Sequence, residues 1–155
     1  VDRLTITGDG NANLIGYLNA QEDNTHWFYV AATADVDSDA VIDFGHQITK
    51  GSAIAESGGR FTVAVAGTYL LTCSMQNASD FDDTMHVYFR KNTTRVGGTI
   101  YWEGPTGGQD YASESATIII PLAANDVVDV YGQGRFSGNS NAEASTTFCG
   151  IRLGE

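Results

Sequence analysis

Apolar residues along this chain occur in short alternating runs and not at the three-and-four spacing of a helix. The runs are rich in β-branched and aromatic side chains and are bounded by Gly, Asn, Asp or Ser, a pattern typical of strands joined by turns. Nine runs are clear, at 26–32, 40–44, 60–65, 68–75, 85–90, 99–102, 115–122, 127–131 and 146–153. Nine short strands at this spacing predict an all-β sandwich or barrel.

The run TYLLTCSM at 68–75 carries apolar residues on both faces of its predicted strand. Alternation assigns one face to large apolar side chains, namely Tyr69, Leu71, Cys73 and Met75. The opposite face carries Leu70 beside the hydroxyls of Thr72 and Ser74. Such a face suits a surface shared with another chain. The alternative is that a loop or the N-terminal segment covers it.

A hairpin is predicted at the N-terminal end, over residues 1–25, ahead of a sandwich domain at 26–155. Its apolar segments, at 4–7 and 14–18, flank the turn residues 8–11. The hairpin is either an attachment arm or an ordinary extra hairpin packed on the domain. Residues 1–24 contain neither a basic leader nor an apolar run with a cleavage site. We therefore expect either that a leader was removed or that the chain is a piece of a longer protein.

The composition argues against nucleic-acid binding and membrane insertion. The 155 residues contain 42% apolar residues and form one domain with a sizeable core. Eight Lys and Arg against 19 Asp and Glu give a net charge of −11, which would repel nucleic acid and anionic membranes. The longest apolar run, 118–124, is far shorter than the roughly 20 residues of a membrane-spanning helix. We expect no nucleic-acid partner and no membrane insertion.

Catalytic motifs are missing from the sequence. The three histidines, His26, His46 and His86, have no second His or Cys at metal-ligand spacing. No nucleophile elbow, phosphate-binding glycine loop or zinc-protease helix motif occurs. The chain is therefore predicted to be non-enzymatic and to require no cofactor.

Calcium is the metal that the acidic loops could hold. Asp35, Asp37 and Asp39 begin like a calcium-binding loop, but Ala40 and His46 stand where that loop needs Gly and Glu. The segment is thus either a looser Ca²⁺ site or a solvated acidic loop. The same choice applies to a second cluster, Asp80, Asp82 and Asp83.

Four motifs follow one another in a specific order. Residues 59–71 read GRFTVAVAGTYLL, 90–92 read RKN, 116–130 read ATIIIPLAANDVVDV and 148–153 read FCGIRL. Over about residues 26–153 this order resembles the jelly roll shared by complement subcomponent q globular heads and tumour necrosis factor-like ligands. The resemblance implies a two-sheet jelly-roll sandwich that forms a homotrimer. Residues 27–29 and 40–47 would be its first strand and the return of that strand.

The resemblance also implies which residues meet at the trimer interface. Leu70, Thr72, Phe148 and Arg152 would point toward the threefold axis, with Gly150 close to it. The family prefers an apolar residue at the position of Arg152, and three arginines near one axis repel unless they are paired. We therefore expect Arg152 to have an acidic or carbonyl partner on a neighbouring subunit.

The two cysteines would lie on adjacent strands, because the resemblance places Cys73 and Cys149 with their side chains toward the core. They either form a cross-strand disulfide or remain two buried thiols, and free cysteine is a common small core residue.

Two further sets of residues are candidates for binding. Heads of the complement type carry calcium near the trimer axis through an Asp-Tyr pair, and Asp110-Tyr111 is the corresponding dipeptide. The segment 101–111 combines aromatic residues with glycine turns and amides, which suits recognition of sugar or protein. Trp102 and Tyr111 are its candidate binding residues, and they are equally compatible with a core position.

Two functions fit these expectations. The first is a homotrimeric module on the surface of a virus particle, a phage head decoration or a fibre knob, with possible receptor binding. The acidic Gly-, Asn-, Ser- and Thr-rich composition, the lack of a collagen repeat and the N-terminal hairpin favour it. The alternative is a secreted, extracellular lectin or ligand head that binds glycans or a protein receptor.

Overall fold

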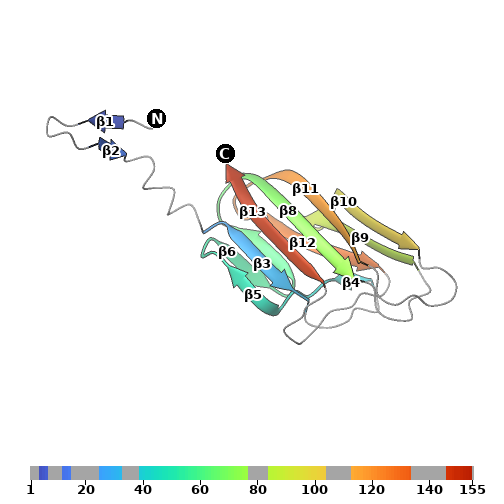
Figure 1. Ribbon diagram of the computed structural model, residues 1–155. Coiled ribbons are helices and arrows are strands. Elements are labelled where there is room, and N and C mark those ends of the chain that lie inside the picture. Colours follow the sequence, from blue (N-terminus) through green and yellow to red (C-terminus); the bar gives the residue numbers. More distant parts are fainter. Residues whose placement is uncertain are drawn as a thin grey trace.

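Two antiparallel sheets pack face to face in the computed structural model of this chain (Figure 1). The structure describes residues 4–6, 12–14, 25–32, 39–76, 84–103, 113–133 and 146–154. One sheet has the strand order β11-β8-β13-β3-β5 and the other the order β10-β9-β12-β7-β6, with β4 paired to β12. The predicted all-β, two-sheet sandwich is confirmed. No helix long and apolar enough to cross a membrane occurs in the part of the chain that is described.

The strands vary from two to ten residues in length. The five-stranded sheet consists of β3 (Trp27–Ala31), β5 (His46–Lys50), β8 (Gly67–Gln76), β11 (Ser113–Leu122) and β13 (Thr147–Gly154). The six-stranded sheet consists of β4 (Ala40–Val41), β6 (Ile54–Ser57), β7 (Arg60–Val63), β9 (Thr84–Lys91), β10 (Thr94–Glu103) and β12 (Val127–Gln133).

The segment 40–47 forms the predicted return of the first strand only at its end, where His46 pairs with Ala31. Val41 in β4 pairs with Tyr131 of the opposite sheet, and the strand that pairs with β3 is β5, which begins at His46. Ile42 and Phe44 lie between these two strands and are fully buried. The apolar run therefore marks a crossing between the two sheets, where burial on all sides selects the same residue types as a strand does.

Phe148 lies at the centre of the core between the two sheets. Its ring makes edge contacts with Phe28, at 4.8 Å between centroids, and with Phe61, at 5.4 Å. The rings of Phe44 and Phe89 lie within 6 Å of it as well. Offset and edge contacts of this kind add to the free energy gained from burying apolar surface. Phe148 thus joins strands from both sheets.

The turn between β11 and β12 is held by the carboxylate of Asp126. Its Oδ2 accepts a hydrogen bond from the Ala123 amide at 2.7 Å and pairs with Nζ of Lys91 at 2.7 Å. Its Oδ1 accepts from the side-chain amide of Asn92 at 2.7 Å. These interactions, with the hydrogen bond from Lys91 foremost, lower the pKa of Asp126. The carboxylate therefore ties the β9–β10 turn to the β11–β12 turn.

The predicted N-terminal hairpin forms from two short strands, β1 (Leu4–Ile6) and β2 (Ala12–Leu14). They pair antiparallel, with Leu4 opposite Leu14. The predicted second segment, 14–18, begins two residues later than β2, and residues 15–24 lie outside the described part of the chain.

Replacing Phe148 with Ala should lower the free energy of unfolding by about 3–5 kcal/mol, because a large ring is removed from a packed core. The measurement is chemical denaturation at one fixed protein concentration, with Ser57→Ala, a change at the exposed end of β6, as the control. A loss below about 1 kcal/mol would show that Phe148 is not a core residue.

Replacing Asp126 with Asn should lower the free energy of unfolding at neutral pH by about 1–3 kcal/mol, since bonds to a charged group are lost. Because folding lowers the pKa of Asp126 below its usual 3.8, the wild-type stabilisation is present above that value and disappears as the pH falls through the folded pKa.

The test is the free energy of unfolding measured between about pH 6 and pH 2, where Asp126→Asn should show the shallower decline. Asp39→Asn makes the same change at an exposed position and is the matched control. Parallel curves for wild type and Asp126→Asn would contradict the assignment.

Candidate functional site

A row of large apolar side chains crosses the outward face of the five-stranded sheet. Strand register places Ile119 beside Leu70, Leu70 beside Ile151, and Ile151 beside Trp27. Ile119 is 64% exposed and Ile151 is 45% exposed, while Leu70 and Trp27 are partly buried. We call these four residues the apolar row.

A cavity of about 310 Å³ opens along the apolar row. Its walls combine members of the row with buried and half-buried neighbours from β3 and β13, and the complete lining is Trp27, Phe28, Leu70, Cys149, Gly150 and Ile151. A hollow with apolar walls on an open sheet face can accept a protruding apolar side chain from another molecule.

Hydroxyl and small side chains continue the face beyond the apolar row. The next row runs from Thr117 through Thr72 and Cys149 to Tyr29. The Thr72 and Thr117 hydroxyls form a hydrogen bond to each other at 2.9 Å. The face therefore changes from apolar to weakly polar along the strands and carries no charge in these two rows.

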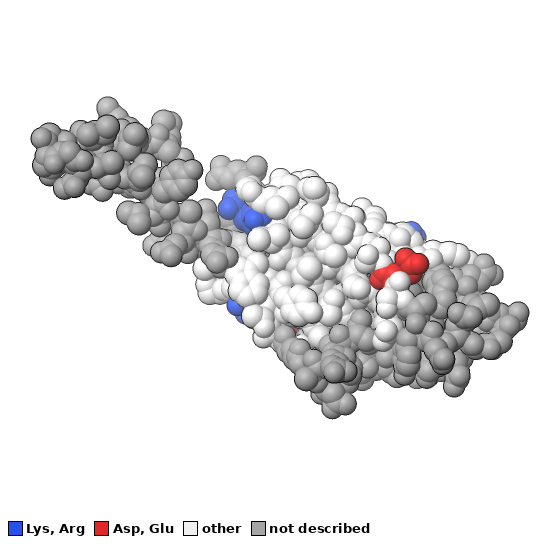
Figure 2. Space-filling model, viewed as in Figure 1, with Lys and Arg blue, Asp and Glu red and all other residues white. Residues whose placement is uncertain are grey.

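Figure 2 shows the same face as a surface. Over the middle of β3, β13 and β8 the surface is neither acidic nor basic, and basic side chains appear near the C-terminal end of β13 and at the margins of the view. A chain with a net charge of −11 thus leaves the middle of this face free of charge, a distribution typical of an interface core.

Leu70 and Thr72 lie on the outward face, as the alternation in β8 predicts. The expectation that Phe148 points outward is wrong, because its side chain is fully buried between the sheets. Gly150 also faces inward, since a Cβ there would come within 2.5 Å of the Phe28 ring. In β13 the outward residues are Cys149, Ile151 and Leu153 instead. A shift of one residue along a strand exchanges its two faces.

The two cysteines do not both face the core, because Cys149 lies on the outward face of β13. Both are free, and they lie on opposite faces, Cys73 in the core and Cys149 half-buried on the outward face. Phe148 stands opposite Cys73 in the register, and Cys149 stands opposite Thr72. Burial raises the pKa of both thiols, so each is a thiol and not a thiolate at neutral pH.

Arg152 finds its partner within its own chain. Its Nε donates to the Ala66 carbonyl at 3.0 Å, and the side chain borders a second cavity, of about 370 Å³, with Val65 and Gly67. Burial raises the pKa of the nearby Tyr69 phenol, and the positive charge of Arg152 opposes that shift. This carbonyl belongs to the same chain, and the expected partner on a neighbouring subunit stays a prediction.

The metal and loop candidates fall largely outside the described residues. Asp35, Asp37, Asp110 and Tyr111 are not described, and for Trp102 only the backbone is, opposite Met85. Asp39 accepts a hydrogen bond from Gln133 at 3.2 Å. Among the described residues no group of three or more His, Cys, Asp or Glu could hold a metal ion. The second acidic cluster, Asp80, Asp82 and Asp83, is also outside them.

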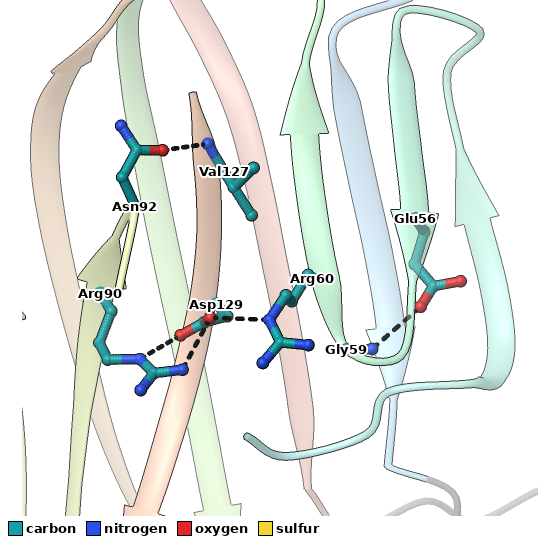
Figure 3. A network of polar contacts seen from close by, with 7 residues as sticks. All are labelled: Glu56, Gly59, Arg60, Arg90, Asn92, Val127 and Asp129. Atoms are coloured by element: carbon teal, nitrogen blue, oxygen red, sulfur yellow. Dashed lines mark hydrogen bonds and ion pairs between the residues drawn. The ribbon is translucent and has the colours of Figure 1, made fainter. Parts of the chain in front are cut away.

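The six-stranded sheet presents a different outward face, built on ion pairs (Figure 3). Asp129 lies between two arginines and is only 2% exposed. Arg90 binds it with two hydrogen bonds, of 2.7 and 2.9 Å, and Nε of Arg60 lies 3.6 Å away. These hydrogen bonds raise the pKa of Arg90. The buried carboxylate is thereby compensated on both sides.

Sequence reasoning missed most of the apolar row. Trp27, Ile119 and Ile151 were not among the predicted interface residues, although the alternation of Cys149, Ile151 and Leu153 is a signal that could have identified β13's outward face. Ile119 is identified by its pairing with Leu70 on the neighbouring strand, and strand pairing is not evident from the sequence alone.

Comparisons with known proteins agree with this architecture. A structural comparison finds 336 matching chains. One of them, the crystal structure of murine APRIL at pH 5.0, has a TM-score of 0.66 and 14% sequence identity, covering 83% of this chain and 98% of that chain. No curated protein sequence matches significantly. The family model of the C1q domain matches residues 27–153. This chain therefore belongs to the C1q domain family, with the jelly-roll fold that C1q and tumour necrosis factor-like proteins share.

Proposed function

We propose that the chain is the subunit of a homotrimeric recognition head, in which the outward face of the five-stranded sheet packs against two further copies. Domains of the C1q and tumour necrosis factor-like type are typically non-enzymatic, form homotrimers and bind receptors. The number of subunits is inferred from the family, and the location of the interface is inferred from this chain's own residues.

The observation that carries the proposal is the apolar row. Ile119 and Ile151 expose about half or more of their surface, and they adjoin Leu70 and Trp27 across four neighbouring strands. Removing apolar surface from water is favourable by about 25 cal/mol per Å², before the entropic cost of association is subtracted. A continuous apolar surface of this kind on a soluble chain marks an interaction site, and self-association removes it from water in every copy at once.

The weakly polar end of the face supports the same packing. The hydrogen bond between Thr72 and Thr117 is made within one chain, so these hydroxyls can enter an interface with a partner already in place. Buried polar groups that keep such a partner avoid most of the desolvation cost.

We propose further that the trimer is a surface module of a virus particle, a head decoration or a fibre knob. The β1–β2 hairpin that precedes the sandwich suits attachment to a larger assembly, and an acidic surface keeps neighbouring heads apart. The alternative is a secreted head, since C1q and tumour necrosis factor-like domains are commonly extracellular or secreted.

Light scattering of the purified chain should give about 50 kDa, three times the subunit mass of 16.5 kDa. Leu70→Asp and Ile151→Asp should each reduce this to the mass of one subunit, because each would bury an unpaired carboxylate. Tyr101→Asp, which places the same charge at an exposed position on the other sheet, is the matched control and should leave the mass at about 50 kDa.

An unchanged mass for both interface variants, with wild-type circular dichroism, would exclude this face as the interface. A wild-type mass of one subunit would exclude the trimer itself.

The virion role is tested by quantitative mass spectrometry of purified particles from the source of the gene. We expect the chain at a fixed stoichiometry that is a multiple of three per particle, and loss of this signal when residues 1–24 are deleted. Recovery only as free protein in the medium would support the secreted head instead.

A further inference from the structure

Tyrosine and arginine side chains interleave on the outward face of the six-stranded sheet. The rings of Tyr88 and Tyr131 stack at 5.5 Å between centroids. The guanidinium of Arg90 lies 4.3 Å from the centroid of Tyr131, and that of Arg95 lies 4.7 Å from the centroid of Tyr88. With Tyr101, these residues form what we call the tyrosine–arginine face.

His86 extends the face toward Tyr101. Its ring meets Tyr88 at 5.6 Å and Tyr101 at 6.0 Å, both edge-on. A ring nitrogen of His86 lies 3.2 Å from the side-chain oxygen of Gln133. The side chains are therefore held in place before any ligand arrives, which reduces the entropy lost on binding.

The described side chains of this face carry more positive than negative charge, whereas the chain as a whole is acidic. The described side chains of this face include three arginines, Arg60, Arg90 and Arg95, and the carboxylate of Asp129 is almost completely buried between the first two. The Arg60 side chain is 52% exposed, and Arg95 is exposed as well, where it also donates to the Thr99 hydroxyl. Asp39 lies at the margin, beyond Gln133. Among the described side chains, an approaching anion meets the exposed guanidinium groups of Arg60 and Arg95.

The fold does not need this arrangement for its core. The inward residues of the same strands, among them Val87, Phe89, Val128 and Val130, fill the space between the sheets. Tyr101 is 60% exposed and buries little. Aromatic and arginine side chains together are the residues in which interaction surfaces are enriched.

We infer that the tyrosine–arginine face binds an acidic oligosaccharide. The apolar C–H faces of the sugar rings stack on the tyrosine rings. The carboxylates of the sugar pair with the exposed guanidinium of Arg95, whose planar fork matches a carboxylate. The phenol hydroxyls and the amide of Gln133 bond with sugar hydroxyls. This inference goes beyond the proposed trimer and does not depend on it.

A sugar fits this surface better than a peptide does. Peptides bind in apolar pockets, extend the edge of a sheet, or pair acidic side chains with a cluster of arginines. Two of the three arginines here, Arg60 and Arg90, are already paired with Asp129. Both cavities described above lie elsewhere, one on the opposite sheet and one beside Arg152. The edge strand here is β10, and its pairing is interrupted between Arg95 and Ile100 by two register shifts at Gly97, which makes it a poor template for a further strand.

The experiment is calorimetric titration of the purified chain with two acidic probes and their neutral parents. Trigalacturonate is compared with galactotriose, and sialyllactose with lactose. At least one acidic probe should bind at least 10-fold more tightly than its parent, and added salt should weaken the binding.

The variants Tyr101→Ala and Arg95→Ala should each weaken binding of that probe about 10-fold or more, since both residues are exposed and their loss leaves the core intact. Arg95→Lys keeps the charge but not the planar stacking group, and it should recover only part of the affinity. Lys50→Ala removes one positive charge from the five-stranded sheet and should change the affinity less than 2-fold.

The monomeric variant Leu70→Asp should bind the probe like wild type in solution, so failure of the trimer and failure of the sugar site give different results. Two outcomes would overturn the inference. One is that neither acidic probe binds more tightly than its neutral parent. The other is that Lys50→Ala weakens binding as much as Arg95→Ala does.

Discussion

Large apolar side chains lie on both faces of the central strands of one sheet, and the rest of the account depends on removing both faces from water. The inward face of β8 and β13 is buried by the opposite sheet, around the ring of Phe148. The outward face presents Leu70 and Ile151, and within a single chain nothing in the described residues covers Ile151. A strand buried on both faces is natural inside a larger assembly.

The outward faces of the two sheets consequently differ in character. The five-stranded sheet is uncharged over its middle, as Figure 2 shows, and is suited to pack against copies of itself. The six-stranded sheet carries the ion pairs of Asp129 with Arg60 and Arg90 and the stacked Tyr88 and Tyr131, and is suited to remain in water. Because the faces point in opposite directions, association through one leaves the other accessible for recognition.

Much of the fold could be predicted from the sequence. The strand at 68–75 was assigned to the correct faces because its inward residues, such as Leu71, are large and apolar while Thr72 and Ser74 are hydroxyls. The order of four motifs was enough to identify the jelly roll, and the family match over residues 27–153 confirms it.

The candidate site was harder to predict, because alternation fails where both faces are apolar. In β13 the residues Phe148 and Ile151 lie on opposite faces, and hydrophobicity alone does not say which one points inward. The deciding fact is the space above Gly150, which the Phe28 ring occupies. The tyrosine–arginine face depends on register between β9 and β12, such as Tyr88 opposite Tyr131. The alternation of residues within one strand does not show which residues of a neighbouring strand stand opposite them.

The most direct test of the central claim is the rate at which a thiol reagent alkylates Cys149, which lies half-buried on the outward face. The mass from light scattering gives the number of subunits, whereas the alkylation rate of Cys149 reports whether the outward face of the five-stranded sheet is buried between them. The account predicts that Cys149 is protected in the wild-type chain and is alkylated at least 10-fold faster in Ile151→Asp, with Cys73 unreactive in both. Equal rates at Cys149 in the two proteins would contradict it.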